Sequence, residues 1–311
     1  MNTSREISLV IPCFNEEEGL QTFYNELIKQ LPQLHTFELI FIDDGSHDQT
    51  LTILKKLAKN DERIRYLSLS RNFGHQNALK AGYDYATGDC AISMDADLQH
   101  PPVLLLDFIA KWSEGFDIVN SIRKDHKSIS LSKRISSRLF YSFINKMSDV
   151  KIGQGMADFR LLDRKVLDQL KRFNENHIFF RGIVPWLGFK QTDIEYQAAE
   201  RYAGTTKYTF RKMLHFASDG VTSFSVKPLR YSIYLGLFFA FLAFIYLLYA
   251  IYIYLFTEQA VAGWTSIVVS IVFFGGLNLI MLGIIGEYLG KLFIENKRRP
   301  SYLISETNFT K

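Results

Sequence analysis

The stretch ISLVIPCFNEEEG, residues 7–19, passes from a mainly apolar run into a polar loop. The apolar run predicts a buried strand over 7–12, and the pattern after it predicts a helix over 17–31. The same alternation of strand and helix continues up to residue 121. Strands are expected at 37–42, 64–69, 90–94 and 117–121, and helices at 48–60, 74–87 and 102–114. This alternation predicts an α/β fold with a mostly parallel sheet and helices on both of its faces.

Composition and charge narrow the class of the protein. A length of 311 residues is enough for one large α/β domain and a smaller part. The net charge of +4 is too modest to indicate a nucleic-acid partner. Cys13 and Cys90 stand in apolar, strand-like runs without the spacing of a zinc site, so we expect two reduced core thiols.

Two uncharged apolar segments lie near the C-terminus, at 232–256 and 264–286. Each is long enough to cross a hydrocarbon core of about 30 Å. Basic residues flank the pair at both ends, and such flanks stay on the cytoplasmic side. They are Lys227, Arg230, Lys291, Lys297, Arg298 and Arg299. No signal-peptide pattern precedes the first strand, so we expect a multi-pass protein of the bacterial inner membrane with its catalytic part in the cytoplasm.

These features divide the chain into a cytoplasmic catalytic domain over 1–225 and a two-span anchor with a basic cytoplasmic tail over 226–311. Within the first part, the segment 132–147 places apolar residues every four positions and basic residues between them. This pattern predicts a basic amphipathic helix on the membrane surface, and an ordinary surface helix packed on the core is the alternative. A second amphipathic patch, at 208–224, is expected to rest on the same surface.

The segment MDADLQHPP, residues 94–102, carries two carboxylates at the end of an apolar strand. In parallel sheets, ligands bind where loops leave the carboxyl ends of the strands. Asp95 and Asp97 are hard oxygen ligands of the kind that Mg²⁺ or Mn²⁺ takes on a diphosphate. The segment DDGS at 43–46 reaches the same edge. There Asp43 can accept from a base or a ribose hydroxyl, while the residues after it cap a turn.

Taken together, these segments resemble the A-type glycosyltransferases of family 2. The resemblance is strongest to the bacterial polyprenyl-phosphate glycosyltransferases related to dolichol-phosphate mannose synthase and bactoprenol glucosyltransferase. It covers nearly the whole chain, on the segments IPCFNEEEG (11–19), DDGS (43–46), SRNFGHQNAL (70–79), MDADLQHPP (94–102), DFRLLDRKV (158–166), RYAGTTKY (201–208) and GEYLGKLFIENKRRPSY (286–302). The chain departs from the family at 203–206, where Ala-Gly-Thr-Thr replaces a commoner Gly-Glu-Ser pattern, and this weakens the case for Thr205.

The resemblance implies a nucleotide-sugar site built from several loops. Its residues are Pro12, Asn15, Glu16, Asp43, Asp95, Gln99 and Lys207. Asp95 and Asp97 are also the expected ligands of Mg²⁺ or Mn²⁺. Asp97, Asp158 and Arg201 are the residues expected to carry catalysis.

The acceptor side is expected around Asp158, which by resemblance lies beside the acceptor. A helix cap with Arg160 as its partner is the alternative for this residue. Arg201 and Lys207 can close over the donor diphosphate or the acceptor phosphate. A phosphate reception area is expected nearby, made of Arg123, Arg134 and Arg138. The last two equally fit simple attraction to anionic lipid headgroups.

The expected reaction is inverting transfer of a sugar to polyprenyl phosphate, such as undecaprenyl phosphate, at the cytoplasmic face of the membrane. The product would be a lipid-linked sugar for modification of cell-envelope glycans. UDP-glucose is the first choice of donor by resemblance, and N-acetylglucosamine, mannose and aminoarabinose remain open. A phosphate monoester has a second pKa of about 6, so it needs orientation more than a strong base. Asp158 would orient the acceptor or take a residual proton.

Two other functions fit the sequence less well. A processive polysaccharide synthase carries Gln-x-x-Arg-Trp, whereas the nearest run here joins Gln197 to Arg201-Tyr202 with different spacing and no Trp. A non-catalytic membrane partner of a lipid-sugar flippase would have no need of the acidic motif. A homo-oligomer is compatible with the glycines at 286 and 290, which permit close helix contact.

Overall fold

The computed structural model describes residues 6–31, 36–124, 145–147, 153, 155–176, 178–197, 225–256 and 263–309. The predicted amphipathic patch at 208–224 lies outside these residues, as does the predicted surface helix at 132–147 except for its last three positions. Both therefore stay predictions.

The strand and helix alternation expected from the sequence is present in the structure. The elements are β1 (Glu6–Cys13), α1 (Leu20–Gln30), β2 (Thr36–Asp43), α2 (Thr50–Asn60), β3 (Ile64–Leu69), α3 (His75–Tyr85), β4 (Cys90–Ser93), α4 (Leu104–Ser113) and β5 (Ile118–Lys124). Four further elements complete the domain. They are β6 (Met156–Asp163), α6 (Arg164–Leu170), α7 (Phe180–Trp186) and β7 (Gln191–Gln197).

Among the described residues, eight strands form one sheet in the order β7-β5-β6-β4-β1-β2-β3-β8, in which β8 covers Ile304–Thr307. Strands β4, β1, β2 and β3 run parallel, and β7 runs parallel to β5. Strand β6 is antiparallel to both of its neighbours. The predicted class, a mostly parallel α/β sheet, is confirmed, and the antiparallel β6 brings a second group of side chains to the edge where β1, β2 and β4 end.

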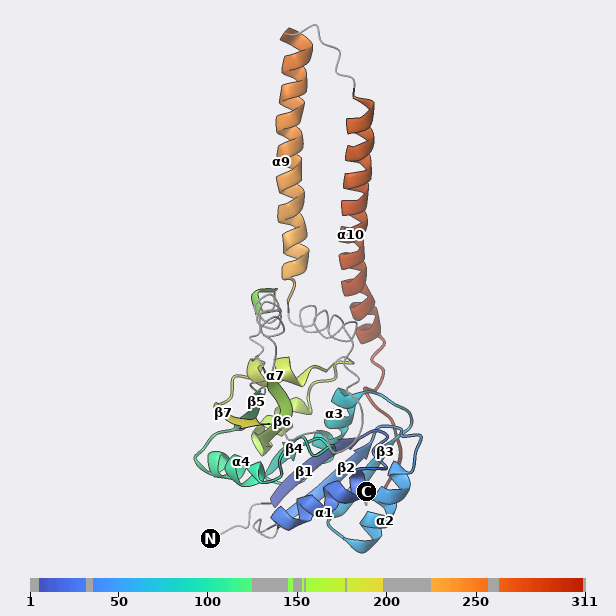
Figure 1. Ribbon diagram of the computed structural model, residues 1–311, viewed down its shortest axis with the longest axis vertical. Helices are drawn as coiled ribbons and strands as arrows, with labels where there is room; N and C mark the ends of the chain where they lie inside the picture. The colour runs from blue at the N-terminus through green and yellow to red at the C-terminus, as the bar shows by residue number, and fades with distance from the viewer. Residues whose placement is uncertain are drawn as a thin grey trace.

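Helices cover both faces of this sheet (Figure 1). Side chains on β1 alternate between the two faces, so Leu9 joins the core under α1, α2 and α4 while Val10 joins the core under α3, α6 and α7. Strands buried on both faces read as continuous apolar runs, which is why they were recognisable in the sequence. Cys13 and Cys90 are buried and unbridged, as expected.

Two long helices, α9 (Lys227–Phe256) and α10 (Trp264–Asn296), extend away from the sheet and lie next to each other (Figure 1). By length and composition both can cross a membrane, and none of the apolar window of either is buried inside the protein. Helix α10 continues past the expected end of the second span at 286 as far as Asn296.

The segment after α10 contains strand β8 (Ile304–Thr307), which pairs antiparallel with β3, and the expected cytoplasmic location of this basic tail stays a prediction. Backbone and side chains anchor this segment, since Ser70 N donates to Leu303 O (2.8 Å) and Tyr66 N donates to Asn308 Oδ1 (2.7 Å). The strand is four residues long and has three exposed positions, so no apolar alternation marked it in the sequence. The chain after α10 thus returns to the sheet.

Candidate active site

A cavity of about 610 Å³ lies at the carboxyl edge of the sheet. Its walls come from the loop after β1, the loop after β4, the start of α3, strand β6 and helix α7. The predicted residues in its lining are Pro12, Glu16, Asp95, Asp97 and Asp158. The structure adds Asp44, His75, Gln76 and Arg181 to them. Asn15, Asp43 and Gln99 lie outside this lining.

The loop after β1 is held in place by the loop after β2. Asn15 adopts a left-handed backbone with φ of 54°, a conformation that asparagine tolerates better than most residues. Its N–H donates to Ser46 Oγ (3.0 Å), and its Oδ1 accepts from His47 N (3.0 Å). Glu16 N donates to Thr50 Oγ1 (2.9 Å). Asn15 therefore shapes the wall that carries Pro12 and Glu16.

Asp43 and Asp44 are buried where β2 passes into its loop, and Asp44 lines the cavity. Asp43 is 1% exposed and accepts from Ser46 N (3.1 Å) and Ser68 Oγ (3.0 Å). Asp44 accepts from the N–H groups of Phe73 (2.7 Å) and Gly74 (3.0 Å). Burial raises the pKa of Asp44 above its ordinary value, although these two bonds oppose the change. The carboxylate of Asp43 is thus bonded to Ser46 and Ser68 within the protein. Its contact with a nucleotide stays a prediction.

The turn that follows β2 requires glycine at position 45. Gly45 has φ of 68°, and an added Cβ would lie 2.3 Å from the backbone carbon of Arg71. No side chain fits at that distance. The close approach packs the DDGS loop against the segment after β3, which leads into the start of α3.

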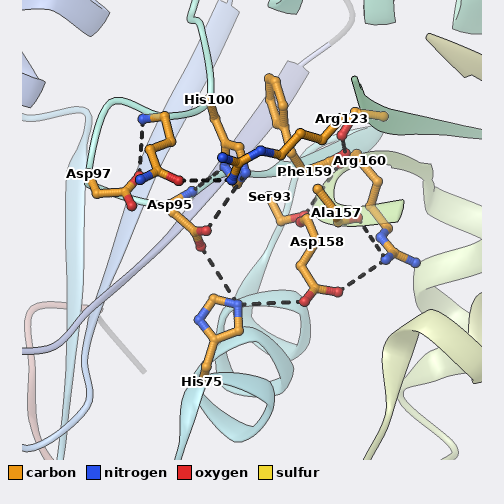
Figure 2. Close-up of polar contacts among 12 residues, drawn as sticks. His75, Ser93, Asp95, Asp97, His100, Arg123, Ala157, Asp158, Phe159 and Arg160 are labelled. Atoms are coloured by element: carbon orange, nitrogen blue, oxygen red, sulfur yellow. Dashed lines mark hydrogen bonds and ion pairs between the residues drawn. The ribbon is translucent and has the colours of Figure 1, made fainter. Parts of the chain in front are cut away.

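The acidic loop after β4 carries Asp95 and Asp97 into the cavity (Figure 2). Asp95 lies between two histidines, with its carboxylate 3.6 Å from His75 Nε2 and 3.7 Å from His100 Nε2. Asp95 N donates to His100 Nδ1 (2.9 Å), which fixes the loop on a buried imidazole stacked on the Phe159 ring. Asp95 itself remains partly open to solvent and available to a ligand.

Gln99 and Arg123 form a neighbouring pair at the rim of the acidic loop. Asp97 Oδ1 accepts from Gln99 N (3.1 Å), and Gln99 Oε1 accepts from Arg123 Nη1 (3.2 Å). Leu98, between Asp97 and Gln99, has a positive φ of 59°, which turns the chain sharply after the acidic motif. Arg123 therefore lies near the acidic loop, and its predicted contact with the acceptor phosphate stays a prediction.

Asp158 lies inside β6, so the helix-cap alternative is wrong, although Arg160 is indeed its partner. The carboxylate is 5% exposed. It accepts from Arg160 Nη2 (3.1 Å), Arg181 Nη2 (3.0 Å) and Gln76 Nε2 (3.1 Å). Burial alone would raise the pKa of Asp158, but the charges of Arg181, Arg160 and His75 hold it well below the usual range. The group is an ionised anchor within a cationic cluster.

The sequence motifs missed the role of α7. Arg181 belongs to no acidic or glycine-rich motif, and it reaches the cavity only because α7 packs against β6. Gln76 stood inside the segment SRNFGHQNAL, but nothing in that segment indicated a contact with Asp158. The four remaining predicted cations lie outside the described residues and stay predictions. They are Arg134, Arg138, Arg201 and Lys207.

The donor set of the cavity fits a divalent ion shared with a ligand. Asp95 and Asp97 offer carboxylate oxygens, the kind of ligand that Mg²⁺ and Mn²⁺ prefer. In the part of the chain that the structure describes, no group of three or more His, Cys, Asp or Glu could hold an ion alone. The two aspartates therefore fit an ion whose other ligands are diphosphate oxygens and water.

Comparison with known proteins agrees with this architecture. The model of glycosyl transferase family 2 matches residues 8–171. The uncharacterized glycosyltransferase YkcC of Bacillus subtilis is 41% identical over 308 residues, which are 99% of this chain and 95% of that protein. The bactoprenol glucosyl transferase of Shigella phage SfV is 42% identical over 301 residues, which are 96% of this chain and 98% of that protein.

A similar fold is found in a mannosyltransferase from Pyrobaculum calidifontis, solved in complex with GDP-Man and Mn²⁺. It aligns with a TM-score of 0.50 at 15% identity, over 71% of this chain and 64% of that chain. The fold is that of the A-type glycosyltransferases. The chain belongs to glycosyltransferase family 2.

Proposed function

We propose that this enzyme transfers glucose from UDP-glucose to a polyprenyl phosphate at the cytoplasmic face of the membrane, with inversion at the anomeric carbon. The observation that carries the proposal is the division of one cavity into an acidic wall and a cationic wall. Asp95 and Asp97 form the first, and Arg181 with Asp158 forms the second. The bactoprenol glucosyl transferase of phage SfV, similar along nearly its whole length, supports glucose and a polyprenyl carrier.

The acidic wall would hold Mg²⁺ or Mn²⁺ through Asp95 and Asp97. The ion, when bound, would act as a Lewis acid that neutralises charge on the departing nucleoside diphosphate. Pro12 and Glu16, on the loop after β1, would border the nucleotide at the carboxyl edge of the sheet.

The cationic wall suits an anionic acceptor. A phosphate monoester is largely a dianion above its second pKa of about 6, so it can attack without a strong general base. Asp158 keeps its charge and is held by two guanidinium groups, which fits an orienting residue rather than a base. The rate enhancement would come from positioning and electrostatic stabilisation.

The membrane part of the proposal follows from α9 and α10. Polyprenyl phosphate is confined to the bilayer, so an enzyme that uses it benefits from being held beneath the membrane. The basic residues at both ends of the helix pair support a cytoplasmic location for those ends and for the domain joined to them.

The test is transfer by the purified full-length protein in nanodiscs that contain undecaprenyl phosphate. Radiolabelled UDP-glucose, UDP-N-acetylglucosamine and GDP-mannose are supplied in turn with Mg²⁺ or Mn²⁺. Label from UDP-glucose should move into the organic phase. Transfer from another sugar nucleotide alone would overturn the choice of glucose, and no lipid-linked label from any donor would overturn the proposal.

A further inference from the structure

A second cavity, of about 600 Å³, lies where α10 ends next to α3 (Figure 1). Its walls come from α3, the loop after α6, the end of α10 and the segment that leads to β8. It is separate from the candidate active site, since the two linings share no residue. Its charged lining residues are three cations, Lys80, Arg298 and Arg299, and two carboxylates, Asp84 and Glu295.

Both carboxylates of this cavity are bonded within the protein. Asp84 pairs with Lys80 and accepts from Tyr302 Oη (2.9 Å). Glu295 Oε1 accepts from Asn176 N (2.9 Å). The first set of bonds ties the segment after α10 to α3, and the second ties the end of α10 to the loop before α7. The two carboxylates therefore hold the walls of the cavity together.

The cations, in contrast, keep donor groups to offer. Lys80 is 4% exposed, and Asp84 is the one partner of its ammonium among the described residues. An ammonium has three N–H donors, so two of them remain. The guanidinium groups of Arg298 and Arg299 form no ion pair and no hydrogen bond within the part of the chain that the structure describes. Three positive and two negative charges give the lining a formal charge of +1.

The backbone at Arg298 also distinguishes this site. Arg298 follows Lys297, the C-cap of α10, and has a left-handed φ of 49°. Its N–H donates to Glu295 O (3.0 Å), which closes the last turn of the helix. Glycine is the usual residue at this position, because a side chain there costs conformational free energy. An arginine in a strained backbone conformation next to a cavity indicates that its side chain has a function.

We propose that this cavity is a binding site for a phosphate group, held by Arg298, Arg299 and Lys80. Guanidinium forks donate paired hydrogen bonds to phosphate oxygens, and the ammonium supplies a point charge. Three cations suit a phosphate better than a carboxylate, because a phosphate monoester carries up to two negative charges on three oxygens. A volume of about 600 Å³ is typical of small-molecule sites, so it accommodates a phosphate carried by a larger molecule.

Two sources offer a phosphate at this place. In the proposed topology, α10 ends on the cytoplasmic side of the membrane, where the headgroups of anionic phospholipids lie. Free phosphate in the cytosol is the other source. Both present the same oxygens to the three cations, so the experiment supplies each of them separately. The binding itself does not depend on the proposed transfer reaction.

The experiment uses the full-length protein in dodecyl maltoside, a detergent without phosphate, and without divalent metal. Calorimetry measures the affinity for inorganic phosphate and, separately, for phosphatidylglycerol in mixed micelles. Arg298→Gly and Arg299→Gln should each weaken binding by about tenfold or more, the effect of losing a charge-assisted bond. The matched control is Lys297→Gln, which removes one positive charge outside the lining, where the ammonium lies over the Phe293 ring (4.1 Å). Its affinity should stay within about twofold of the wild type.

Arg298→Gly also separates binding from stability. Glycine adopts the left-handed conformation without strain, so the thermal unfolding midpoint of this variant should stay level or rise while phosphate affinity falls. A fall in the midpoint with unchanged affinity would show that the arginine only completes the end of α10, and it would overturn the inference.

Competition between the two ligands identifies the source. Displacement of inorganic phosphate by phosphatidylglycerol assigns the site to a lipid headgroup, and phosphate binding that persists in saturating phosphatidylglycerol assigns it to a free phosphate; either result supports the site. Absence of binding of both ligands to the wild type would overturn the inference, as would an equal loss of affinity in Lys297→Gln. Failure of the wild type to label lipid would count against the proposed function alone.

Discussion

At the scale of single residues, the charge state of Asp158 determines which pH dependence the enzyme can show. Because its pKa is held below the usual range, acidification from pH 8 to pH 5 leaves this carboxylate ionised. The rate should therefore fall on the acid side with the second ionisation of the acceptor phosphate, near a pKa of about 6. The measurement is kcat/KM for polyprenyl phosphate between pH 5 and pH 8.

A thiophosphate acceptor shows whether the fall in rate at low pH comes from the acceptor or from a group of the protein. Its phosphoryl group is more acidic than phosphate, so the limb should move to lower pH. A limb that stays in place would assign the titration to the protein and contradict the role given to the acceptor. Donor saturation throughout keeps metal and nucleotide binding out of the profile.

Asp97 is the residue whose loss should most cleanly separate fold from activity. It lies in a loop at the cavity, so Asp97→Asn should leave the thermal unfolding midpoint nearly unchanged. Transfer should fall by about a hundredfold or more, since charge on the leaving diphosphate is no longer neutralised. EDTA added to the wild type should have the same effect, reversed by Mn²⁺.

The matched control for Asp97 is Asp168→Asn, on the exposed side of α6, where the carboxylate lies 3.8 Å from Arg164. It should keep full activity. Undiminished transfer in excess chelator would contradict metal dependence, and an Asp97→Asn protein that unfolds at a much lower temperature would contradict a purely functional role.

The acidic motif was predictable because local spacing alone puts Asp95 and Asp97 after a strand. The cationic wall was not predictable in the same way. Arg181 contacts Asp158 across 23 positions of sequence, and the contact exists only once β6 runs antiparallel beside β4. For Asp43 the motif was visible in the sequence, but the sequence did not show that its carboxylate is buried and bonded to Ser46 and Ser68.

At the scale of elements, the buried parallel strands were predictable and the edge strand was not. Strands β1 and β2 are apolar along most of their length because both faces are covered. Strand β8, with sequence ISET, owes its conformation to pairing with β3 rather than to its own side chains. Secondary structure that depends on a distant partner leaves little trace in local periodicity.

One bond between elements can be tested directly. Tyr302 Oη donates to Asp84 Oδ2 (2.9 Å), and Asp84 also pairs with the buried ammonium of Lys80. Tyr302→Phe should destabilise the protein by about 1 kcal/mol, because it removes a bond to a charged group. The measurement is the unfolding midpoint of the detergent-solubilised protein.

The control for this bond is Tyr85→Phe, at the position after Asp84 in α3. Tyr85 packs its ring on Phe309 with centroids 5.1 Å apart, and the phenylalanine keeps that packing. Its unfolding midpoint should stay close to the wild type. Equal losses from Tyr302→Phe and Tyr85→Phe would show that the hydroxyl bond to Asp84 contributes nothing specific.

At the scale of the whole molecule, the proposed topology predicts opposite accessibility of two chain segments. A cysteine introduced into 257–262 should react with an impermeant maleimide in intact cells, whereas one appended after Lys311 should react only after permeabilisation. Native background should be low, since Cys13 and Cys90 are buried and burial, reinforced by Glu16 and Asp43, raises the pKa of the Cys13 thiol. The reverse pattern would contradict a cytoplasmic active site.

The return of β8 to the sheet also has a consequence for biosynthesis. Among the described strands, β8 is the last to be synthesised, and two candidate spans separate it from β3. Until it arrives, the edge of β3 exposes unpaired backbone groups of the kind that recruit foreign strands. In the proposed topology, a nascent chain that has inserted both spans brings residues 304–307 to the side of the membrane where β3 lies, whereas a chain that has inserted one span leaves them on the other side. Completion of the sheet would then depend on correct insertion, and a chain with one span inserted would keep an open edge at β3.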